Sequence, residues 1–243
     1  MGLFDFLGGS RDPQKGIDKI KRRLMDPYRQ SHERYAAMDD LVKLGTPAAL
    51  EAMLDRFTLR VSGPTVDEEE KQYCHQVISK WGDVAVEPLK RFIATKDAVY
   101  FPLQALRDIA GDEVAVAALL EAIEGTDPGY HEARERLHEI VSNLRDFQHD
   151  RVRDALVGLL TSRSAEIRVY ALDGLAGYPA EAVASHFASR MLDPEESLRV
   201  KALAYERAVD LALPLLPWSA QLKPVLPPTY RLDDHGALVR ATA

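Results

Sequence analysis

Apolar side chains recur along most of this 243-residue chain at the spacing that places them on one face of an α-helix. Leu50, Met53, Leu54 and Phe57 stand at positions i, i+3, i+4 and i+7, and three later stretches repeat this spacing. Alternating apolar runs and Asn-Gly turns, which would indicate strands and hairpins, are almost absent. A helix with one apolar stripe cannot bury it alone, so the sequence predicts an all-α protein whose helices pack against one another.

Turn-forming residues divide these helices into pairs. Four glycines each end an apolar stretch, as a glycine just beyond a helix C-terminus commonly does: Gly45, Gly82, Gly111 and Gly177. Asp83 and Asp112 follow at positions where a side-chain oxygen caps the next helix. Longer breaks separate the pairs, which recur about every 30 to 37 residues. We place the pairs at residues 31–58, 69–95, 97–124, 128–161, 163–192 and 195–212.

Helical pairs that recur in this way stack into an α-solenoid, in which each pair buries apolar surface only against its neighbours. One compact bundle of helices is the alternative arrangement. Helix lengths and turn residues recur in register along the chain, and this recurrence favours the solenoid. We therefore expect an α-solenoid of about six helical pairs over residues 31–212.

Two stretches of the chain resemble a known family of helical repeats. Residues 167–177, IRVYALDGLAG, resemble the first helix of a HEAT-like repeat of the phycobilin-lyase type, and residues 198–203 repeat its opening. Residues 105–116 resemble the end of that helix, the turn and the start of the second helix. The fourth pair departs from the pattern, because Asp146 and Phe147 stand where the turn glycine should be. The resemblance implies a HEAT/armadillo-like superhelix, but it does not imply lyase activity, because this fold hosts many functions.

Residues 1–30 lie outside the repeats and form an amphipathic, basic N-terminal segment. Leu3, Phe4, Phe6 and Leu7 would gather on one side of a short helix, and eight Lys or Arg residues follow within residues 11–34. Apolar anchors beside a basic stretch are typical of a tether to an anionic membrane surface or to a groove on a partner. Covering the open end of the solenoid is the other interpretation of these four side chains.

Residues 213–243 also differ from the repeats, because they contain five prolines and no helical period. Proline fixes φ and removes a backbone donor, so this segment is predicted to be a proline-rich extended tail. We expect the tail to fold back along the last repeats as a strap.

The sequence contains three His-Glu dipeptides that could carry metal chemistry: His32-Glu33, His131-Glu132 and His138-Glu139. They resemble the dipeptides that hold a di-iron centre in the deoxyhypusine hydroxylases, a family of HEAT-repeat enzymes. In that family the dipeptide recurs at a fixed place in several repeats, whereas here the three fall at different offsets. We therefore expect solvated histidines on helix faces, no metal site and no cofactor.

Composition excludes several other classes of protein. The one cysteine, Cys74, excludes an internal disulfide framework, and no apolar run approaches the roughly 20 residues of a membrane span. The formal net charge of -7 argues against nucleic acid as a partner. Motifs of nucleophilic hydrolases, phosphate-binding loops and zinc proteases are missing, so no catalytic residue is predicted. A cytoplasmic location is expected.

By analogy with the family, the second helix of each pair lines the concave side of the solenoid. Its outward polar residues form the predicted partner-binding surface: Asp55, Arg56, Lys90, Arg91, Glu121, Glu124, Arg153, Asp154, His186 and Arg190. Alternating charge favours a polar peptide or protein surface over a polyanion. The sequence thus predicts a non-enzymatic scaffold that binds a protein partner. The alternative is an enzyme or enzyme accessory on the same fold, either a lyase-type cofactor chaperone or a metal-dependent hydroxylase.

Overall fold

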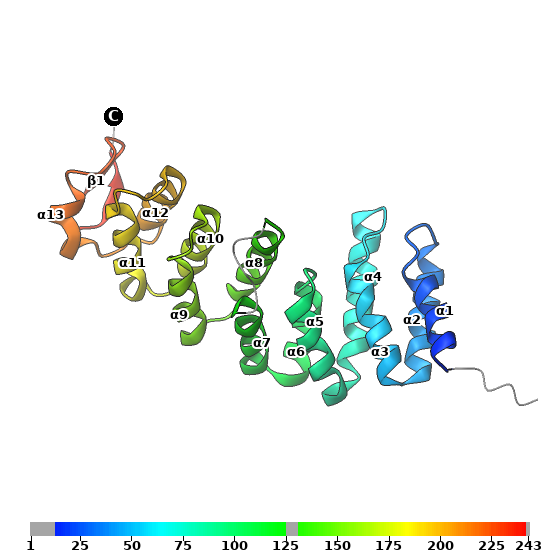
Figure 1. Cartoon of the computed structure of the whole chain (residues 1–243). Coiled ribbons are helices and arrows are strands. Elements are labelled where there is room, and N and C mark those ends of the chain that lie inside the picture. Colours follow the sequence, from blue (N-terminus) through cyan, green and yellow to red (C-terminus); the bar gives the residue numbers. More distant parts are fainter. Residues whose placement is uncertain (1–12, 125–130, 242–243) are drawn as a thin grey trace, which may run out of the picture. The chain divides into compact units, whose positions relative to one another are not determined.

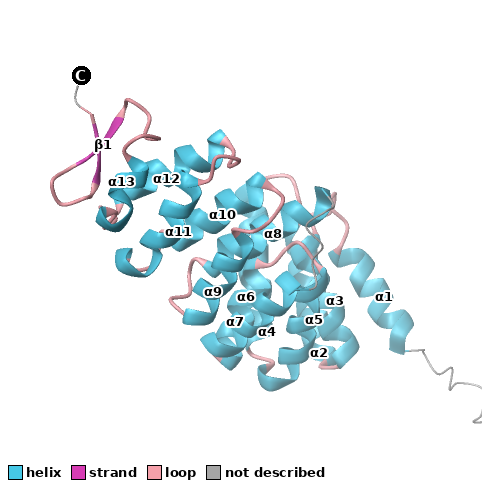
Figure 2. Cartoon of the chain, turned by 60° about the vertical axis from the view of Figure 1, so that its left-hand side comes forward, coloured by secondary structure: helices cyan, strands magenta, loops and turns pink. Residues whose placement is uncertain are grey.

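The computed structural model describes residues 13–124 and 131–241, and these residues are almost entirely helical. The chain divides into two compact units, Met1–Ala118 and Leu119–Ala243, which are described separately below. Strands occur in the described residues only near the C-terminus, where Figure 2 shows them as a short hairpin. The predicted all-α, solenoid-like class of fold is therefore confirmed.

The first unit consists of antiparallel helical pairs preceded by one additional helix. Its elements are α1 (Pro13–Leu24), α2 (Ser31–Leu44), α3 (Pro47–Leu54), η1 (Asp55–Thr58), α4 (Pro64–Ser79), η2 (Gly82–Ala85), α5 (Val86–Thr95) and α6 (Tyr100–Ala110). The next helix, α7 (Asp112–Glu124), extends across the division between the units.

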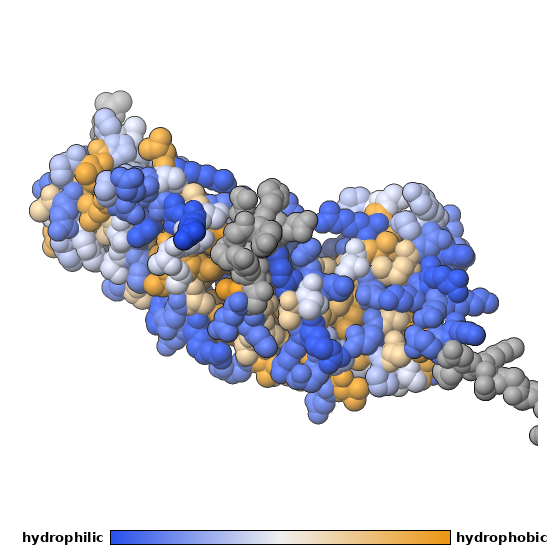
Figure 3. Space-filling view, viewed as in Figure 1, coloured by the Kyte–Doolittle hydropathy of each residue, from blue (hydrophilic) through white to orange (hydrophobic). Residues whose placement is uncertain are grey.

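Helices of the first unit contact mainly their neighbours in the row (Figure 1). The first helix of each pair contacts the first helix of the next, α2 with α4 and α4 with α6, and the second helices α3 and α5 contact each other in the same way. Met38, Leu41, Leu50, Ile78 and Leu89 are fully buried between them. Hydrophilic side chains cover most of the visible surface of this unit (Figure 3). The apolar periodicity read from the sequence therefore marks the stripes that the stacking buries.

The second unit repeats this arrangement and ends in a short hairpin. Its elements are α8 (His131–Leu144), α9 (Asp150–Leu159), α10 (Ala165–Leu175), α11 (Ala180–Leu192), α12 (Leu198–Asp210), η3 (Leu216–Trp218), α13 (Ser219–Leu222), β1 (Tyr230–Leu232) and β2 (Leu238–Arg240). The first helix α10 packs between α8 and α12, and α11 packs on α12 and α13. Leu156, Leu172, Phe187 and Val200 are fully buried in its core.

Both predicted terminal segments differ in part from expectation. The basic segment contains α1, which packs on α2 and α3 with Ile17 and Leu24 buried, whereas the proposed tether residues Leu3, Phe4, Phe6 and Leu7 lie outside the described residues. The C-terminal segment is not simply extended: it forms two short helical turns and an antiparallel hairpin that contacts α12. Proline permits the first turn, because a helix leaves its first backbone N–H groups unpaired.

The C-terminal hairpin meets η3 through a glycine that no other residue can replace without strain. Gly236 has φ of 80°, and a Cβ atom there would lie 2.6 Å from Cα and Cβ of Leu216. Its carbonyl also accepts a hydrogen bond from Leu215 N at 3.1 Å. Gly236→Ala is therefore expected to destabilise the hairpin by about 1 to 3 kcal/mol, measured as faster amide hydrogen exchange over Tyr230–Leu232.

A matched control for this substitution is Gly16→Ala in α1, where a Cβ would meet no atom within 4 Å. Alanine there is expected to leave hairpin exchange unchanged, because the site lies on another helix and alanine favours helix over glycine. Equal hairpin exchange in Gly236→Ala and the wild type would contradict the close contact with η3.

The first unit contains a cluster of buried charges, the Glu70 cluster, made of Arg34, Arg56, Asp67 and Glu70. Arg56 and Glu70 have no exposed surface. Arg34 donates to both Glu70 oxygens at 2.8 and 2.7 Å, and Arg56 donates to Glu70 Oε2 at 3.0 and 2.8 Å. Asp67 accepts a further hydrogen bond from Arg56 at 2.9 Å. The two guanidinium charges are thus matched by two carboxylates inside the unit.

A second cluster of the same kind, the Glu196 cluster, lies in the second unit. Arg168 donates to both oxygens of Glu196 at 2.9 and 2.5 Å, and Arg190 lies 3.4 Å from Glu196 Oε2. Arg168 and Arg190 stand 22 residues apart, as do Arg34 and Arg56. In each unit, therefore, a glutamate from the segment that follows a helical pair is held between two arginines of that pair.

These two glutamates make stability depend on pH. Burial alone would raise the pKa of Glu70 and of Glu196, but hydrogen bonds from the arginines outweigh it and hold each pKa below the ordinary value of 4.5. A carboxyl group whose pKa is lower in the folded state stabilises the fold above the unfolded-state pKa. The free energy of unfolding, measured in urea, is therefore expected to include the full contribution of both glutamates above about pH 4.5. This contribution should be lost progressively as the pH falls below that value.

The control for this prediction is Glu70→Ala, which should show a shallower loss of stability below about pH 4.5 than the wild type. Parallel pH profiles for the two proteins would contradict the assigned role of Glu70.

Candidate functional site

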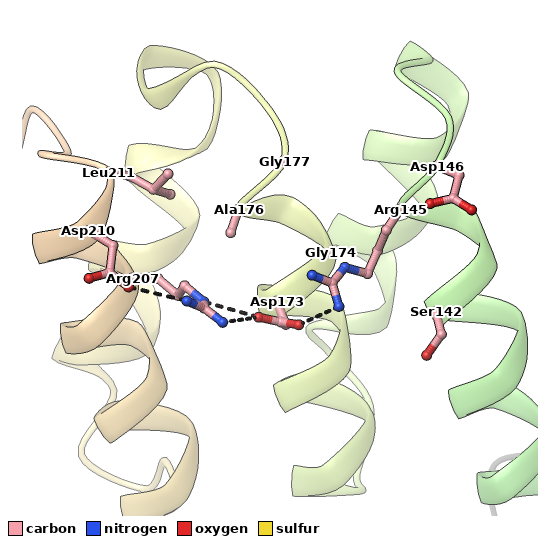
Figure 4. Close-up of a pocket in the computed structure, with 10 residues that line it drawn as sticks. All are labelled: Ser142, Arg145, Asp146, Asp173, Gly174, Ala176, Gly177, Arg207, Asp210 and Leu211. Carbon is pink, nitrogen blue, oxygen red and sulfur yellow. Dashed lines mark hydrogen bonds and ion pairs between the residues drawn. The ribbon is translucent and has the colours of Figure 1, made fainter.

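A pocket of about 500 Å³ opens among the first helices of the second unit (Figure 4). Three helices or the turns that follow them supply its ten lining residues: Ser142, Arg145, Asp146, Asp173, Gly174, Ala176, Gly177, Arg207, Asp210 and Leu211. We call this cavity the Asp173 pocket. Its size falls within the range of about 300 to 1,000 Å³ that is typical of small-molecule sites.

The centre of the Asp173 pocket is a carboxylate held between two guanidinium groups. Arg145 Nη1 lies 2.9 Å from Asp173 Oδ2, and Arg207 Nε and Nη2 donate to Asp173 Oδ1 at 3.0 and 2.7 Å. Arg207 also donates through Nη1 to Asp210 at 3.2 Å. Figure 4 shows both guanidinium groups turned toward Asp173 from opposite sides. The charged groups of the pocket are therefore already oriented before any ligand is bound.

Helix geometry explains why the side chains of α8 meet this carboxylate. Ser142 is in the last turn of α8, and Arg145 directly follows that helix, three residues later, so the two side chains lie on the same side of it. On α10 and α12, Asp173 and Arg207 stand 34 residues apart, close to the repeat length expected from the sequence. The repeat thus places Arg207 of α12 beside Asp173 of the preceding first helix, α10.

Small residues at the end of α10 make room for the cavity. Gly174, Ala176 and Gly177 line it, so no long side chain fills the space beside Asp173. Gly174 also lets α10 approach α9, because a Cβ there would lie only 3.0 Å from Cδ1 of Leu156. The same glycine therefore serves both the helix packing and the shape of the pocket.

The lining residues carry three carboxylates and two guanidinium groups. The hydrogen bond with Asp173 raises the pKa of Arg207 above its ordinary value and opposes the effect of burial, so this guanidinium remains charged. Ser142 adds a hydroxyl group. This set of groups can bind and orient a polar molecule through charge-assisted hydrogen bonds.

Sequence reasoning missed the charged residues of this pocket. The resemblance over residues 167–177 includes Asp173 but predicts only the fold. The signal that could have found the site is the opposite charge of Asp173 and Arg207, one repeat apart on successive first helices. A smaller group of the same type occurs in the first unit, where His75 Nε2 of α4 lies 2.8 Å from Asp108 Oδ2 of α6.

The predicted partner-binding residues occupy several environments. Arg56 is completely buried in the Glu70 cluster, and the expectation of an outward side chain there is wrong because two carboxylates draw the guanidinium inward. Arg190 is half-buried beside Glu196. The other eight are exposed or partly exposed, and their role in binding stays a prediction: Asp55, Lys90, Arg91, Glu121, Glu124, Arg153, Asp154 and His186.

Most of these surface residues form ordinary ion pairs within their own unit. Arg91 pairs with Glu51 at 2.5 Å, and Arg153 pairs with Asp150 at 2.9 Å and with Asp154 at 3.0 Å. Exposed ion pairs of this kind contribute little to stability.

No residue of a His-Glu dipeptide is among the residues that line the Asp173 pocket. Glu33 caps the start of α2 through the backbone N–H of Gln30, and the His138 ring lies 4.0 Å from the Tyr170 ring. The side chains of His131 and Glu132 lie outside the described residues. Within residues whose side chains are described, no three His, Cys, Asp or Glu side chains converge as metal ligands would. None of the described helices is both long and apolar enough to cross a membrane.

Comparison with known proteins leaves the family of this chain open. No protein family and no curated protein matches the sequence. Among solved structures, the chain resembles human deoxyhypusine hydroxylase in complex with glycerol, with 18% sequence identity and a TM-score of 0.31. The match covers 87% of this chain and 89% of the hydroxylase chain.

This comparison contradicts the prediction of a non-enzymatic scaffold, because the matching structure is that of an enzyme. We do not retain the scaffold interpretation. A match with this TM-score assigns no particular reaction to the chain, so its function is argued below from the pocket itself.

Proposed function

We propose that this chain is an enzyme, or an accessory protein of an enzyme, that holds a small charged molecule in the Asp173 pocket. The observation that carries the proposal is a cavity of about 500 Å³ in which oppositely charged groups from two helices and the turn after a third already face one another. Small-molecule sites commonly combine such a preformed cavity with a few convergent polar groups. Groups fixed in advance bind a ligand with less loss of conformational entropy.

The resemblance to repeats of the phycobilin-lyase type supports the accessory form of this proposal. The resembling stretch, residues 167–177, supplies four of the lining residues: Asp173, Gly174, Ala176 and Gly177. An accessory protein of this kind would hold a cofactor or substrate and deliver it to a partner enzyme. The protein partner and the cytoplasmic location expected from the sequence belong to the same proposal.

The alternative to ligand binding is that the ion pairs only fasten the helices to one another. Exposed or half-exposed pairs are weak fasteners, and Arg145 is 52% exposed and Arg207 35% exposed. Close packing of α10 on α9 accounts for Gly174, but helix fastening does not require small residues at Ala176 and Gly177, because a filled space there would bury more apolar surface. The open space beside Asp173 therefore favours ligand binding.

The proposal can be tested by isothermal titration of the purified protein with four classes of small molecule. These classes are amino acids, dicarboxylates, phosphate monoesters and polyamines. We expect at least one class to bind with one-to-one stoichiometry and a Kd of about 1 mM or below. Ala176→Trp, which fills the cavity, should weaken this binding more than tenfold.

The matched control is Ala182→Trp, the same change at an exposed position of α11 away from the pocket. This variant should bind as the wild type does. Binding that persists in Ala176→Trp, or the absence of binding by all four classes, would contradict the proposal.

A further inference from the structure

Two adjacent residues that line the Asp173 pocket, Arg145 and Asp146, have hydrogen-bonding groups without a partner among the residues that the structure describes. Arg207 engages all three of its guanidinium nitrogens, with Asp173 and Asp210. Arg145 engages only Nη1, with Asp173 at 2.9 Å, among the residues that the structure describes. Its remaining N–H groups can therefore donate two parallel hydrogen bonds to the carboxylate of a ligand. This bidentate arrangement is the strongest one between a guanidinium group and a carboxylate.

The carboxylate of the next residue, Asp146, also lacks a partner among the described residues, and its charge is opposite to that of Arg145. Asp146 lines the pocket and is exposed, and its carboxylate has no hydrogen bond or ion pair with any described residue. Figure 4 shows it just beyond Arg145 at the end of α8. A cationic group placed there would pair with Asp146 and would also face the C-terminal end of a helix, where the backbone carbonyls favour positive charge.

The overall charge of the lining residues excludes a simple anion as the preferred ligand. The five charged side chains sum to -1, so a dicarboxylate or phosphate monoester would be repelled by the pocket as a whole. A polyamine would pair with the carboxylates but would leave the free N–H groups of Arg145 to water, without a charged acceptor. A ligand with both charges close together satisfies both residues and adds no net charge.

We propose that the Asp173 pocket binds a small zwitterion of the free amino-acid type. Its carboxylate pairs with Arg145, and its ammonium group pairs with Asp146. The side chain of the ligand occupies the space left by Gly174 and Ala176 beside Leu211. This inference names the class of molecule for the proposed function and rests on it.

The inference is tested by titrating the full chain with each of the twenty standard L-amino acids. The tightest binder is then compared with its N-acetyl derivative, which lacks the ammonium charge, and with its carboxamide, which lacks the carboxylate charge. We expect each derivative to bind at least tenfold more weakly than the parent amino acid.

Two variants test which residue binds which charged group of the ligand. In Arg145→Gln the parent amino acid and its carboxamide should bind equally well, and in Asp146→Asn the parent and its N-acetyl derivative should bind equally well. Arg163→Gln and Asp234→Asn make the same changes at exposed positions outside the pocket and should behave as the wild type.

The outcomes separate this inference from the proposed function. If both derivatives bind as tightly as the parent amino acid, the assignment of a zwitterionic ligand is wrong and the proposed function stands. The same conclusion follows if only another class of small molecule binds and Ala176→Trp abolishes that binding. If no class of small molecule binds, both are wrong. If the derivatives are weak but the two variants do not change the preference, the assignment to Arg145 and Asp146 is overturned.

Discussion

Replacing Glu70 with alanine is expected to lower the free energy of unfolding by about 3 to 5 kcal/mol. The reason is that Arg34 and Arg56 would remain buried, with only Asp67 left to compensate two guanidinium charges. Taking a charge out of water without a partner is far more costly than losing the attraction between two partners. Chemical unfolding of the full chain in urea, followed by circular dichroism, measures this loss.

The matched control for this variant is Glu69→Ala, which removes an exposed carboxylate from the preceding position of the same helix. It should change the free energy of unfolding by about 0.5 kcal/mol or less. Equal stabilities of the two variants would contradict the burial of the Glu70 cluster.

A triple variant separates the cost of unpaired charges from the contribution of the ion pairs. Arg34→Met, Arg56→Met and Glu70→Leu together remove the charges while keeping much of the volume, and Asp67 retains Lys71 at 2.6 Å. Buried ion groups replaced in this way commonly give a protein of similar or greater stability. We therefore expect the triple variant to be more stable than Glu70→Ala.

Replacing Phe57 with alanine is expected to cost about 3 to 5 kcal/mol as well, for a different reason. Phe57 is 2% exposed, and its ring lies 6.0 Å from the Phe101 ring in a stacked arrangement and 6.2 Å from the Phe92 ring at its edge. These rings belong to η1, α5 and α6, so alanine would leave a cavity where three elements of the first unit meet.

Two further variants test this account of Phe57. Phe57→Leu retains much of the volume and should be less destabilised than Phe57→Ala. Tyr28→Ala removes an aromatic ring that is 94% exposed, so it should change the unfolding midpoint in urea very little. A midpoint for Phe57→Ala close to that of Tyr28→Ala would show that the aromatic cluster does not stabilise the unit.

The helical pairs could be predicted because their cause is local. An apolar side chain at every third or fourth position and a glycine or cap residue at each turn are visible in any short window of the sequence. Gly45 and Gly111 have positive φ directly after α2 and α6, and Gly82 has positive φ where η2 begins, three residues after α4 ends. Gly177, expected to act in the same way, is not among the residues with positive φ, because α10 already ends at Leu175 through αR turns.

The charged clusters could not be predicted, because their partners are distant in sequence. Arg56 meets Glu70 across 14 residues and Asp173 meets Arg207 across 34, and nothing near either arginine distinguishes it from a solvated surface residue. The same limit affected the expected binding surface, which included Arg56 among the outward residues of the second helices although its side chain is buried. The scaffold interpretation rested on that surface.

The most direct test of the central claim is the mapping of amide chemical shifts in the ¹⁵N-labelled protein during titration with the tightest-binding amino acid. If the Asp173 pocket holds a small charged molecule, the shifts should concentrate at residues 142–146, 173–177 and 207–211, and Ala176→Trp should abolish them. Shifts that centre elsewhere, such as around His75 and Asp108, or that persist in Ala176→Trp, would contradict it.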